Sequence, residues 1–102
     1  MDAREHVIVV ARWQAAPGAS DEVLAAATEM RRESLAEPGC LGYELFRPVD
    51  APDALLLIER YRDDAAVEAH RASSHFRELV LGRIVPLLVK REVELLRPRA
   101  AD

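Results

Sequence analysis

Short apolar runs alternate with segments of helical spacing along the chain. Residues 7–13 (VIVVARW), 41–48 (LGYELFRP) and 54–61 (ALLLIERY) are rich in apolar and aromatic residues and are bounded by turn residues, so they predict three strands. Residues 90–98 (KREVELLRP) predict a fourth. The turn sequence VDAPD separates the second strand from the third, and this spacing predicts a hairpin.

Helical spacing fills the intervals between the strands. After a Pro-Gly turn, Ser20 can cap a helix that has an acidic first turn and ends near residue 36, before a second Pro-Gly pair. The apolar face of this helix comprises Val23, Leu24, Ala27 and Met30. Asp63 can cap a short helix through about Arg71, and Ser74 can cap a further helix that ends before Pro86. The residues expected to share a face of that helix are Phe76, Leu79, Val80 and Arg83.

The predicted order of elements is β-α-β-β-α-α-β, and the two halves of the sequence resemble each other in two short segments. ARW at 11–13 resembles ERY at 59–61, and ELFRP at 44–48 resembles ELLRP at 94–98, an offset of about 50 residues. Each half therefore runs from a strand through a helix to a second strand. This pattern predicts an α+β fold, a ferredoxin-like split β-α-β with a four-stranded antiparallel sheet and helices on one face.

Two of the predicted strands have no polar face. Residues 7–11 and 54–58 are each five apolar residues in a row, whereas a sheet with one wet face alternates apolar and polar residues. Exposing a Leu or Ile side chain forgoes about 1.5–3 kcal/mol of burial free energy. We therefore expect a homodimer that packs through this sheet face, with twofold symmetry.

Composition narrows the class of protein. A chain of 102 residues, half of them hydrophobic, fits a single domain over residues 1–102 with its core at about 7–97. The net charge of −4 is spread along the chain and disfavours nucleic-acid binding. The start, MDAREHVIVV, does not resemble a signal peptide, and no segment is apolar enough to cross a membrane, so we expect a cytoplasmic protein. The single cysteine, Cys40, excludes an internal disulfide and is expected to be inert.

Two of the three histidines lie in one short stretch, EAHRASSHFREL. His70 and His75 are five residues apart, which places them about 140° apart on a continuous helix and disfavours a metal pair, for which a spacing of four is typical. A break at residues 73–74 would still let both rings converge. Acid–base chemistry and a simple polar helix junction both remain possible.

Glu59 lies within an otherwise apolar strand. It shares a strand face with Leu55, Leu57 and Tyr61, and a buried carboxylate there needs a partner. The partner could be a histidine that Glu59 orients for catalysis, or an arginine in a structural ion pair.

The aromatic residues Trp13, Tyr43, Phe46, Tyr61 and Phe76 fall mostly on strands. They could form an ordinary core, or a pocket for a flat apolar ligand to which Tyr61 offers a hydroxyl group. The sequence has no nucleophile elbow, P-loop or dinucleotide fingerprint. Any chemistry would therefore depend on the reactivity of the substrate itself.

Three segments resemble a known family. They are VARW followed by the Pro-Gly turn, EPGCLGYELFR, and ERYRDDAAVEAHRASSHF. The last is similar to the pattern Glu-x-aromatic, acidic turn, His-x-x-Ser-x-His-Phe of the antibiotic biosynthesis monooxygenase domain, a member of the dimeric α+β barrel superfamily. The residues that match it are Glu59, Tyr61, His70, Ser73, His75 and Phe76.

The resemblance covers residues 7–97 and implies a homodimer with a pocket between sheet and helices. It also implies oxygenation of an electron-rich aromatic, such as a quinol, an anthrone or a polyketide intermediate, by O₂ without metal, flavin or haem. The implied catalytic residues are His70, Tyr61, Glu59 and His75. The implied substrate-binding residues are Trp13, Met30, Tyr43, Phe46, Leu57 and Phe76. We expect His70 to border the pocket, because its helix must pack beside residues 59–61.

The chain also departs from characterised members of the family. Leu57 and Tyr61 stand where anthrone-oxidising members have Asn and Trp, and Leu45 and Val67 stand where they have tyrosines. The Asn, Trp and His of haem-degrading relatives correspond to Ala11, His70 and Val80. A second possible function is therefore that of a non-catalytic dimer, either one that binds an aromatic ligand or one associated with stress. A third is that of an isomerase or cyclase of the same fold.

Overall fold

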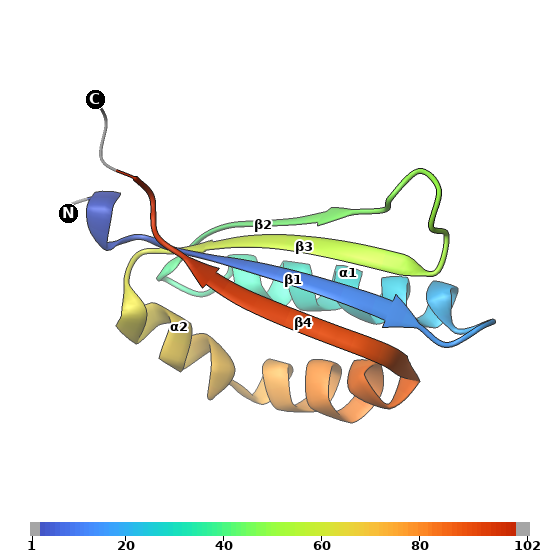
Figure 1. Cartoon of the computed structure of the whole chain (residues 1–102). Helices are drawn as coiled ribbons and strands as arrows, with labels where there is room; N and C mark the ends of the chain where they lie inside the picture. The colour runs from blue at the N-terminus through green and yellow to red at the C-terminus, as the bar shows by residue number, and fades with distance from the viewer. Residues whose placement is uncertain (1–2, 100–102) are drawn as a thin grey trace.

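The computed structural model describes residues 3–99 as a four-stranded antiparallel sheet with helices packed against one face (Figure 1). The elements are η1 (Ala3–Glu5), β1 (Val7–Ala15), α1 (Ser20–Leu35), β2 (Cys40–Phe46), β3 (Ala54–Tyr61), α2 (Asp64–Arg71), η2 (Phe76–Ile84), η3 (Val85–Leu87) and β4 (Leu88–Leu96). No helix in this part of the chain has the length and apolar character needed to cross a membrane.

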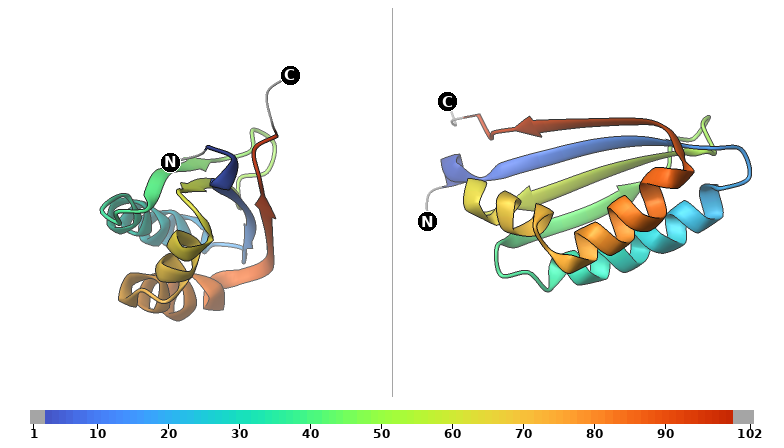
Figure 2. Two further views of the ribbon diagram at one scale, coloured as in Figure 1. Left: turned by 90° about the vertical axis from the view of Figure 1, so that its left-hand side faces the viewer. Right: turned by 90° about the horizontal axis from the view of Figure 1, so that it is seen from below.

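The two halves of the chain each contribute one central strand and one edge strand. The sheet order is β2-β3-β1-β4, so the first strands of the two β-α-β halves lie side by side in the middle. Figure 2 shows α1, α2 and η2 in a layer below the sheet, with the other face uncovered. This architecture confirms the predicted ferredoxin-like α+β fold.

Strand register determines which side chains face the helices. Val9 pairs with Glu59 between β1 and β3, and Tyr43 pairs with the same Glu59 across the predicted β2–β3 hairpin. Between β1 and β4, Trp13 pairs with Arg91. Paired residues point to the same face of a sheet, so these five side chains all lie on the helix-facing side.

The core lies between this inner face and the helices. Along β1 the buried residues are Val7, Val9, Ala11, Trp13 and Ala15, and those of α1 are Val23, Ala26, Ala27, Met30 and Ser34. The intervening residues of β1, Ile8 and Val10, point to the outer face and are half-buried. The strand therefore follows the two-residue period even though its sequence has no polar alternation.

The helix starts differ from the predictions at two serines. Asp63 caps α2 as expected, since its carboxylate accepts a hydrogen bond from the backbone N–H of Ala66 at 2.9 Å. Ser20 makes no capping hydrogen bond to α1, so that prediction was wrong. The cap predicted at Ser74 was also wrong, because it is Ser73 whose Oγ accepts from the backbone N–H of Phe76. The chain turns one residue earlier than the sequence pattern indicated.

The segment after Ser73 is a π-helix rather than an α-helix. Its buried residues are Leu79, Val80 and Ile84. Arg83, expected on the same face as Val80, is instead exposed and pairs with Glu29 on α1 at 3.1 Å. The wider turn of a π-helix, with hydrogen bonds to the fifth residue, moves Arg83 off the face that α-helical spacing predicts. Regular helix ends before Pro86, as predicted.

We predict that Gly39→Ala destabilises the fold by about 1–3 kcal/mol, the usual cost of overpacking a tight contact. A Cβ at Gly39 would lie 2.4 Å from the Cβ of Ala66, a side chain that has no rotamer to move to. Urea denaturation would measure this loss. Gly42→Ala is the matched control, since its nearest neighbour would be 4.0 Å away. An equal effect of both changes, or the same Gly39→Ala cost in an Ala66→Gly background, would contradict the steric explanation.

Candidate active site

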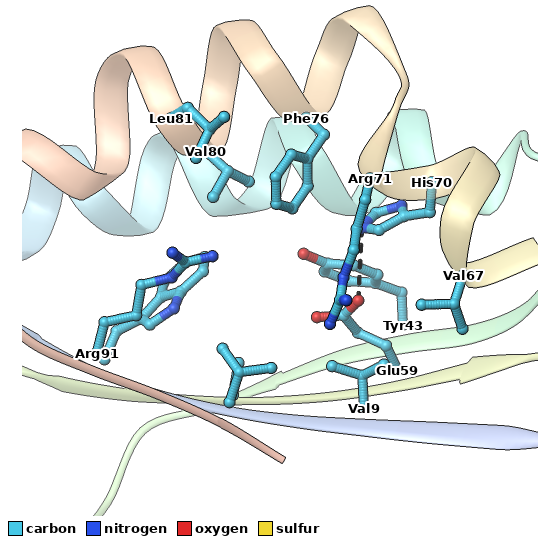
Figure 3. Close-up of a pocket in the computed structure, with 13 residues that line it drawn as sticks. Val9, Tyr43, Glu59, Val67, His70, Arg71, Phe76, Val80, Leu81 and Arg91 are labelled. Carbon is cyan, nitrogen blue, oxygen red and sulfur yellow. Dashed lines mark ion pairs between the residues drawn. The ribbon is translucent and has the colours of Figure 1, made fainter. Parts of the chain in front are cut away.

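A cavity of about 390 Å³ lies between the sheet and the α2–η2 layer (Figure 3). All four strands and both helical segments contribute to it. Its wall is formed by Val9, Ala11, Trp13, Tyr43, Glu59, Val67, His70, Arg71, Phe76, Val80, Leu81, Arg91 and Val93. The volume is within the range of small-molecule sites, and the wall is mostly apolar with a few polar groups.

The cavity exists because the helices do not extend under β4. Arg91 and Val93 point to the inner face of the sheet, yet Val93 is 40% exposed whereas its partner on β1, Ala11, is buried. The edge strand therefore forms one wall of an open cleft rather than one side of a filled core.

One carboxylate holds both histidines of the EAHRASSHFREL segment. Glu37 lies just beyond the C-terminal end of α1, and its Oε2 is 2.9 Å from Nδ1 of His70 and in hydrogen-bond contact with Nε2 of His75. The turn at Ser73 interrupts the helix between the two rings and brings them to the same acceptor. The tautomer of His70 that donates from Nδ1 to Glu37 fits this contact, and in that tautomer Nε2 is an acceptor.

A second carboxylate faces His70 from the sheet. Glu59 is buried, its Oε1 accepts a hydrogen bond of 2.6 Å from the Tyr61 hydroxyl, and the same atom is 3.6 Å from Nε2 of His70. Burial raises the pKa of Glu59 to about 7, although the hydrogen bond from Tyr61 opposes this rise. Glu59 can therefore exchange a proton near neutral pH.

The surroundings of His70 favour its neutral form, which can accept a proton from a substrate. Burial lowers its pKa from the ordinary value, and the hydrogen bond from Nδ1 to Glu37 works in the opposite direction. Its ring packs against Tyr61 and Phe76, with centroids 5.0 and 5.4 Å away, so its orientation is fixed. A neutral, oriented imidazole on a cavity wall is suited to act as a general base.

The hydroxyl of Tyr43 points into the cavity (Figure 3). Burial, followed by the nearby Glu59, raises the pKa of Tyr43 well above its ordinary value. Its hydroxyl therefore stays protonated at neutral pH and can donate a hydrogen bond to a ligand oxygen.

The Glu37, His70 and His75 cluster is also a possible donor set for a divalent metal ion, since its ligand atoms lie within 4.8 Å of one another. The sequence disfavoured a metal pair, because a spacing of five separates the rings on a continuous helix, although a break at residues 73–74 left their convergence open. In the structure the three side chains satisfy one another by hydrogen bonds, which is the arrangement of an acid–base cluster.

The structure brings part of the predicted site together. The cavity wall includes Trp13, Tyr43, Glu59, His70 and Phe76. Tyr61 is fully buried behind Glu59 and reaches the cavity only through that carboxylate. His75 lies behind His70 and contacts it with ring centroids 6.1 Å apart.

Three predicted substrate-binding residues do not line the cavity. Met30 and Leu57 are completely buried in the core beneath α1, so neither can contact a ligand there. Phe46 is 43% exposed and pairs with Leu56, whose side chain points to the outer face. The two-residue period of β2 places Tyr43 inside and Phe46 outside, which the aromatic pattern alone did not distinguish.

The sequence interpretation also missed functional candidates. Glu37 was overlooked because it lies 33 residues before His70, although its place in the EPGC turn, next to a helix end, marked it as structurally constrained. Arg71 and Arg91 were missed as cavity residues because each lies among other charged residues. Cys40 is half-buried, and burial raises the pKa of its thiol, which disfavours the reactive thiolate.

We predict that Glu59→Gln changes the pH dependence of stability. Folding raises the pKa of Glu59 from 4.5 to about 7, so the folded state holds this proton more tightly than the unfolded state. The unfolding free energy therefore loses a contribution on the order of 3 kcal/mol as pH rises through this window. The glutamine side chain does not titrate, so the stability of the variant relative to the wild type should rise from pH 5 to pH 8.

Denaturation midpoints across this pH range would test the prediction. The titratable and charged groups around Glu59 are Tyr43, Tyr61, Glu37, Arg71 and His70, and His70 opposes the trend because its lowered pKa destabilises the fold below neutrality. They are present in both proteins, so the difference between the two curves isolates Glu59. Glu33→Gln, a change at an exposed position of α1, is the control. A flat difference curve would show that Glu59 titrates like an exposed glutamate.

Comparison with known proteins gives a consistent family. The profile of the antibiotic biosynthesis monooxygenase family matches residues 6–80. A Mycobacterium tuberculosis protein that is provisionally named a monooxygenase is 37% identical over 70 residues, covering 69% of this chain and 68% of that protein. A Bacillus subtilis protein with the same provisional name is 28% identical over 74 residues, covering 72% and 78%.

Solved structures agree over nearly the whole chain. The structure of the Mycobacterium tuberculosis protein superposes with a TM-score of 0.87 at 32% identity, covering 94% of this chain and 97% of that one. A crystal structure of an antibiotic biosynthesis monooxygenase gives a TM-score of 0.86 at 32% identity, covering 92% and 99%. Together with the match to the family profile, these similarities place the protein in the antibiotic biosynthesis monooxygenase family.

Proposed function

We propose that the protein is a monooxygenase that oxidises an electron-rich phenolic or anthrone-like aromatic with O₂ and needs neither metal nor flavin. The observation that carries this proposal is the position of His70 on the cavity wall, held by Glu37 on one side and faced by Glu59 on the other. Family membership supports oxygenation as the reaction class.

The cavity suits a flat aromatic substrate. Its apolar wall and the rings of Trp13, Tyr43 and Phe76 favour a planar ring system. The Tyr43 hydroxyl and His70 Nε2 provide one donor and one acceptor on the same side of the cavity. A phenolic hydroxyl that donates to Nε2 would therefore place the ring within the apolar part of the cleft.

The first step is proton transfer from the substrate hydroxyl, or from its enolised carbonyl, to Nε2 of His70. The imidazolium that forms is stabilised by Glu37 at Nδ1 and by the carboxylate of Glu59 at 3.6 Å. The imidazolium and the two carboxylates lie in a site where water screens their charges poorly. Their attraction is therefore stronger than it would be on the surface.

The electrons for oxygen reduction come from the substrate. The aromatic anion transfers one electron to O₂, and the two radicals combine into a peroxide that takes up a proton from His70. Loss of water from this peroxide converts a ring CH₂ group to a ketone, so one oxygen atom enters the product and the other leaves as water with two hydrogens of the substrate. The protein binds, deprotonates and orients the substrate and undergoes no net redox change.

A non-catalytic ligand-binding protein is the second candidate. Val67, which lines the cavity where anthrone-oxidising relatives have a tyrosine, and the buried Leu57 in place of their asparagine favour it. Binding of an aromatic ligand with no protein-dependent oxygen uptake would distinguish this function from oxygenation.

We predict protein-dependent O₂ consumption with a panel of naphthohydroquinones and anthrones, measured with an oxygen electrode in the presence of excess EDTA. His70→Ala should lower the rate by about 10²–10⁴-fold, the usual contribution of a general base. His75→Ala should have a smaller effect, because His75 contacts Glu37 and does not line the cavity. Product formation should stop under nitrogen.

Autoxidation without protein sets the baseline for this assay. His6→Ala is the matched control, since His6 is the remaining histidine and does not line the cavity. Full activity in both His70→Ala and His75→Ala would remove histidine as the base. Turnover that EDTA abolishes would contradict metal independence, and a panel with no uptake above the baseline would favour ligand binding alone.

We further propose that two copies pack through the outer face of the sheet. Ile8, Val10, Leu56 and Ile58 form an apolar strip there that no helix covers. Phe46 and Leu96 extend the strip on either side, and both are more than 40% exposed. A contiguous apolar surface of this kind is typical of a protein–protein interface.

The dimer proposal predicts that the protein sediments at twice the monomer mass. Ile58→Glu should shift it toward monomer, because the new charge would be buried against the apolar strip of the second copy. Sedimentation velocity would measure the mass. Val49→Glu, at a fully exposed loop position, is the control. A monomeric wild type at micromolar concentration would overturn the proposal.

A further inference from the structure

Trp13 presents a buried donor without an acceptor at the far end of the cavity. The residue is only 4% exposed, and its indole Nε1–H has no hydrogen-bond partner within residues 3–99. Trp13 also lines the cavity. Leaving a buried donor unsatisfied destabilises the protein, so a bound ligand that supplies an acceptor would gain the free energy of this missing hydrogen bond.

Arg91 lies directly beside Trp13. The two residues are partners across β1 and β4, so their side chains rise from the same face of the sheet, and both line the cavity. Arg91 has no hydrogen bond or ion pair within the described part of the chain. By contrast, Arg12 on β1 pairs with Glu94, and Arg97 pairs with Asp64 at 2.7 Å.

Arg71, the other cavity arginine, is engaged differently. Its charge acts on Glu59 and lowers the pKa of that carboxyl, opposing the dominant effect of burial. Arg71 is thus part of the electrostatic surroundings of the acid–base cluster. Arg91 is the guanidinium that remains available for a ligand.

The Trp13–Arg91 pair and the acid–base cluster lie at opposite ends of the cleft. Glu59 pairs with Val9, and Trp13 is four residues further along β1, a separation of about 13 Å at 3.3 Å per residue. Figure 3 shows Arg91 on one side of the cavity, and His70, Tyr43 and Glu59 on the other, with open space between them.

We propose that Trp13 Nε1 and Arg91 form a carboxylate-binding subsite, so that the substrate of the proposed reaction is an aromatic acid. Its reacting hydroxyl or enol faces His70, and its carboxylate lies at the far end. This inference rests on the proposed function for the identity of the reacting end, but the subsite itself follows from Trp13 and Arg91. A carboxylate offers one oxygen to each donor, and the guanidinium provides the opposite charge.

Anaerobic binding separates the subsite from the reaction. Three probes of matched ring size are 6-hydroxy-2-naphthoate, its neutral carboxamide and 2-naphthol, titrated by calorimetry under nitrogen. We expect the carboxylate to bind at least about tenfold tighter than either neutral probe, the discrimination expected of a charged hydrogen-bonded contact. Trp13 is the only tryptophan, so its single indole N–H signal in a ¹⁵N-labelled sample should move on binding the carboxylate and much less with 2-naphthol.

Variants assign the preference to its two donors. Arg91→Gln should abolish the preference for the carboxylate and leave 2-naphthol affinity within about twofold of the wild type, since the exposed Arg91 does not support the core. Trp13→Phe should weaken carboxylate binding while its thermal unfolding shows that the variant is folded. Arg77→Gln is the matched control, an exposed arginine on η2 that does not line the cavity.

Three results would overturn the subsite: equal affinities for the three probes, a preference that survives Arg91→Gln, or no binding of any probe at millimolar concentration. The preference can hold in a protein that shows no oxygen uptake, in which case the monooxygenase proposal fails and the subsite stands. Oxygen uptake with neutral probes, together with equal affinities for the three probes, would support the monooxygenase proposal and overturn the subsite.

Discussion

Three helical segments pack against the inner face of the four-stranded sheet, but none of them lies beneath the edge strand β4. The central strands β1 and β3 bury every inward residue, while inward residues of β4 such as Val93 and Leu95 stay 40–48% exposed. The unfilled space under β4 is the cavity. The outer face, which no helix reaches, is the surface left for a second copy. Both the candidate ligand site and the proposed dimer interface therefore come from a sheet wider than its helical layer.

The geometry of Glu37, Glu59, His70 and His75 suits proton transfer because this cluster lies in a partly dry space. Burial raises the pKa of Glu59 to about 7 and lowers that of His70, so near neutral pH Glu59 is partly protonated and His70 is held in its neutral form. On a solvent-exposed surface Glu59 would be ionised at pH 7, and His70 would take up its proton at a higher pH than it does here. Packing by Tyr61 and Phe76 offsets part of the cost and fixes the ring. The fold thus exchanges some stability for groups that can move a proton.

Local sequence signals predicted the elements that depend on short-range patterns. Apolar runs and turn residues located all four strands. The sequence similarity between the two halves predicted the split β-α-β topology. The π-helix was not predictable, because its spacing depends on how the segment after Ser73 packs against α1. Phe46 was misplaced for a similar reason, since its side depends on the register that β2 adopts against β3.

The contacts within the polar cluster were predictable only where its residues share a segment. Glu59 with Tyr61, and His70 with His75, were identified because they are close in sequence. Glu37 was missed because only the folded chain brings it to His70. The spacing argument against a metal pair applied to a continuous helix, and the break that the sequence allowed at residues 73–74 is present at Ser73 and lets the two rings converge.

A protein that supplies no oxidising group must accelerate its reaction through position and electrostatics. One acceptor at His70 would leave a flat substrate free to rotate about its hydroxyl, and the apolar wall in between offers no directional contact. The proposed second anchor at Trp13 and Arg91, about 13 Å along β1 from the level of Glu59, would fix the long axis of the ligand. The aromatic walls then fix its plane, so the carbon that meets oxygen occupies one place in the cleft. The substrate length that fits both anchors thereby becomes a basis for selectivity, independent of how the ring is oxidised.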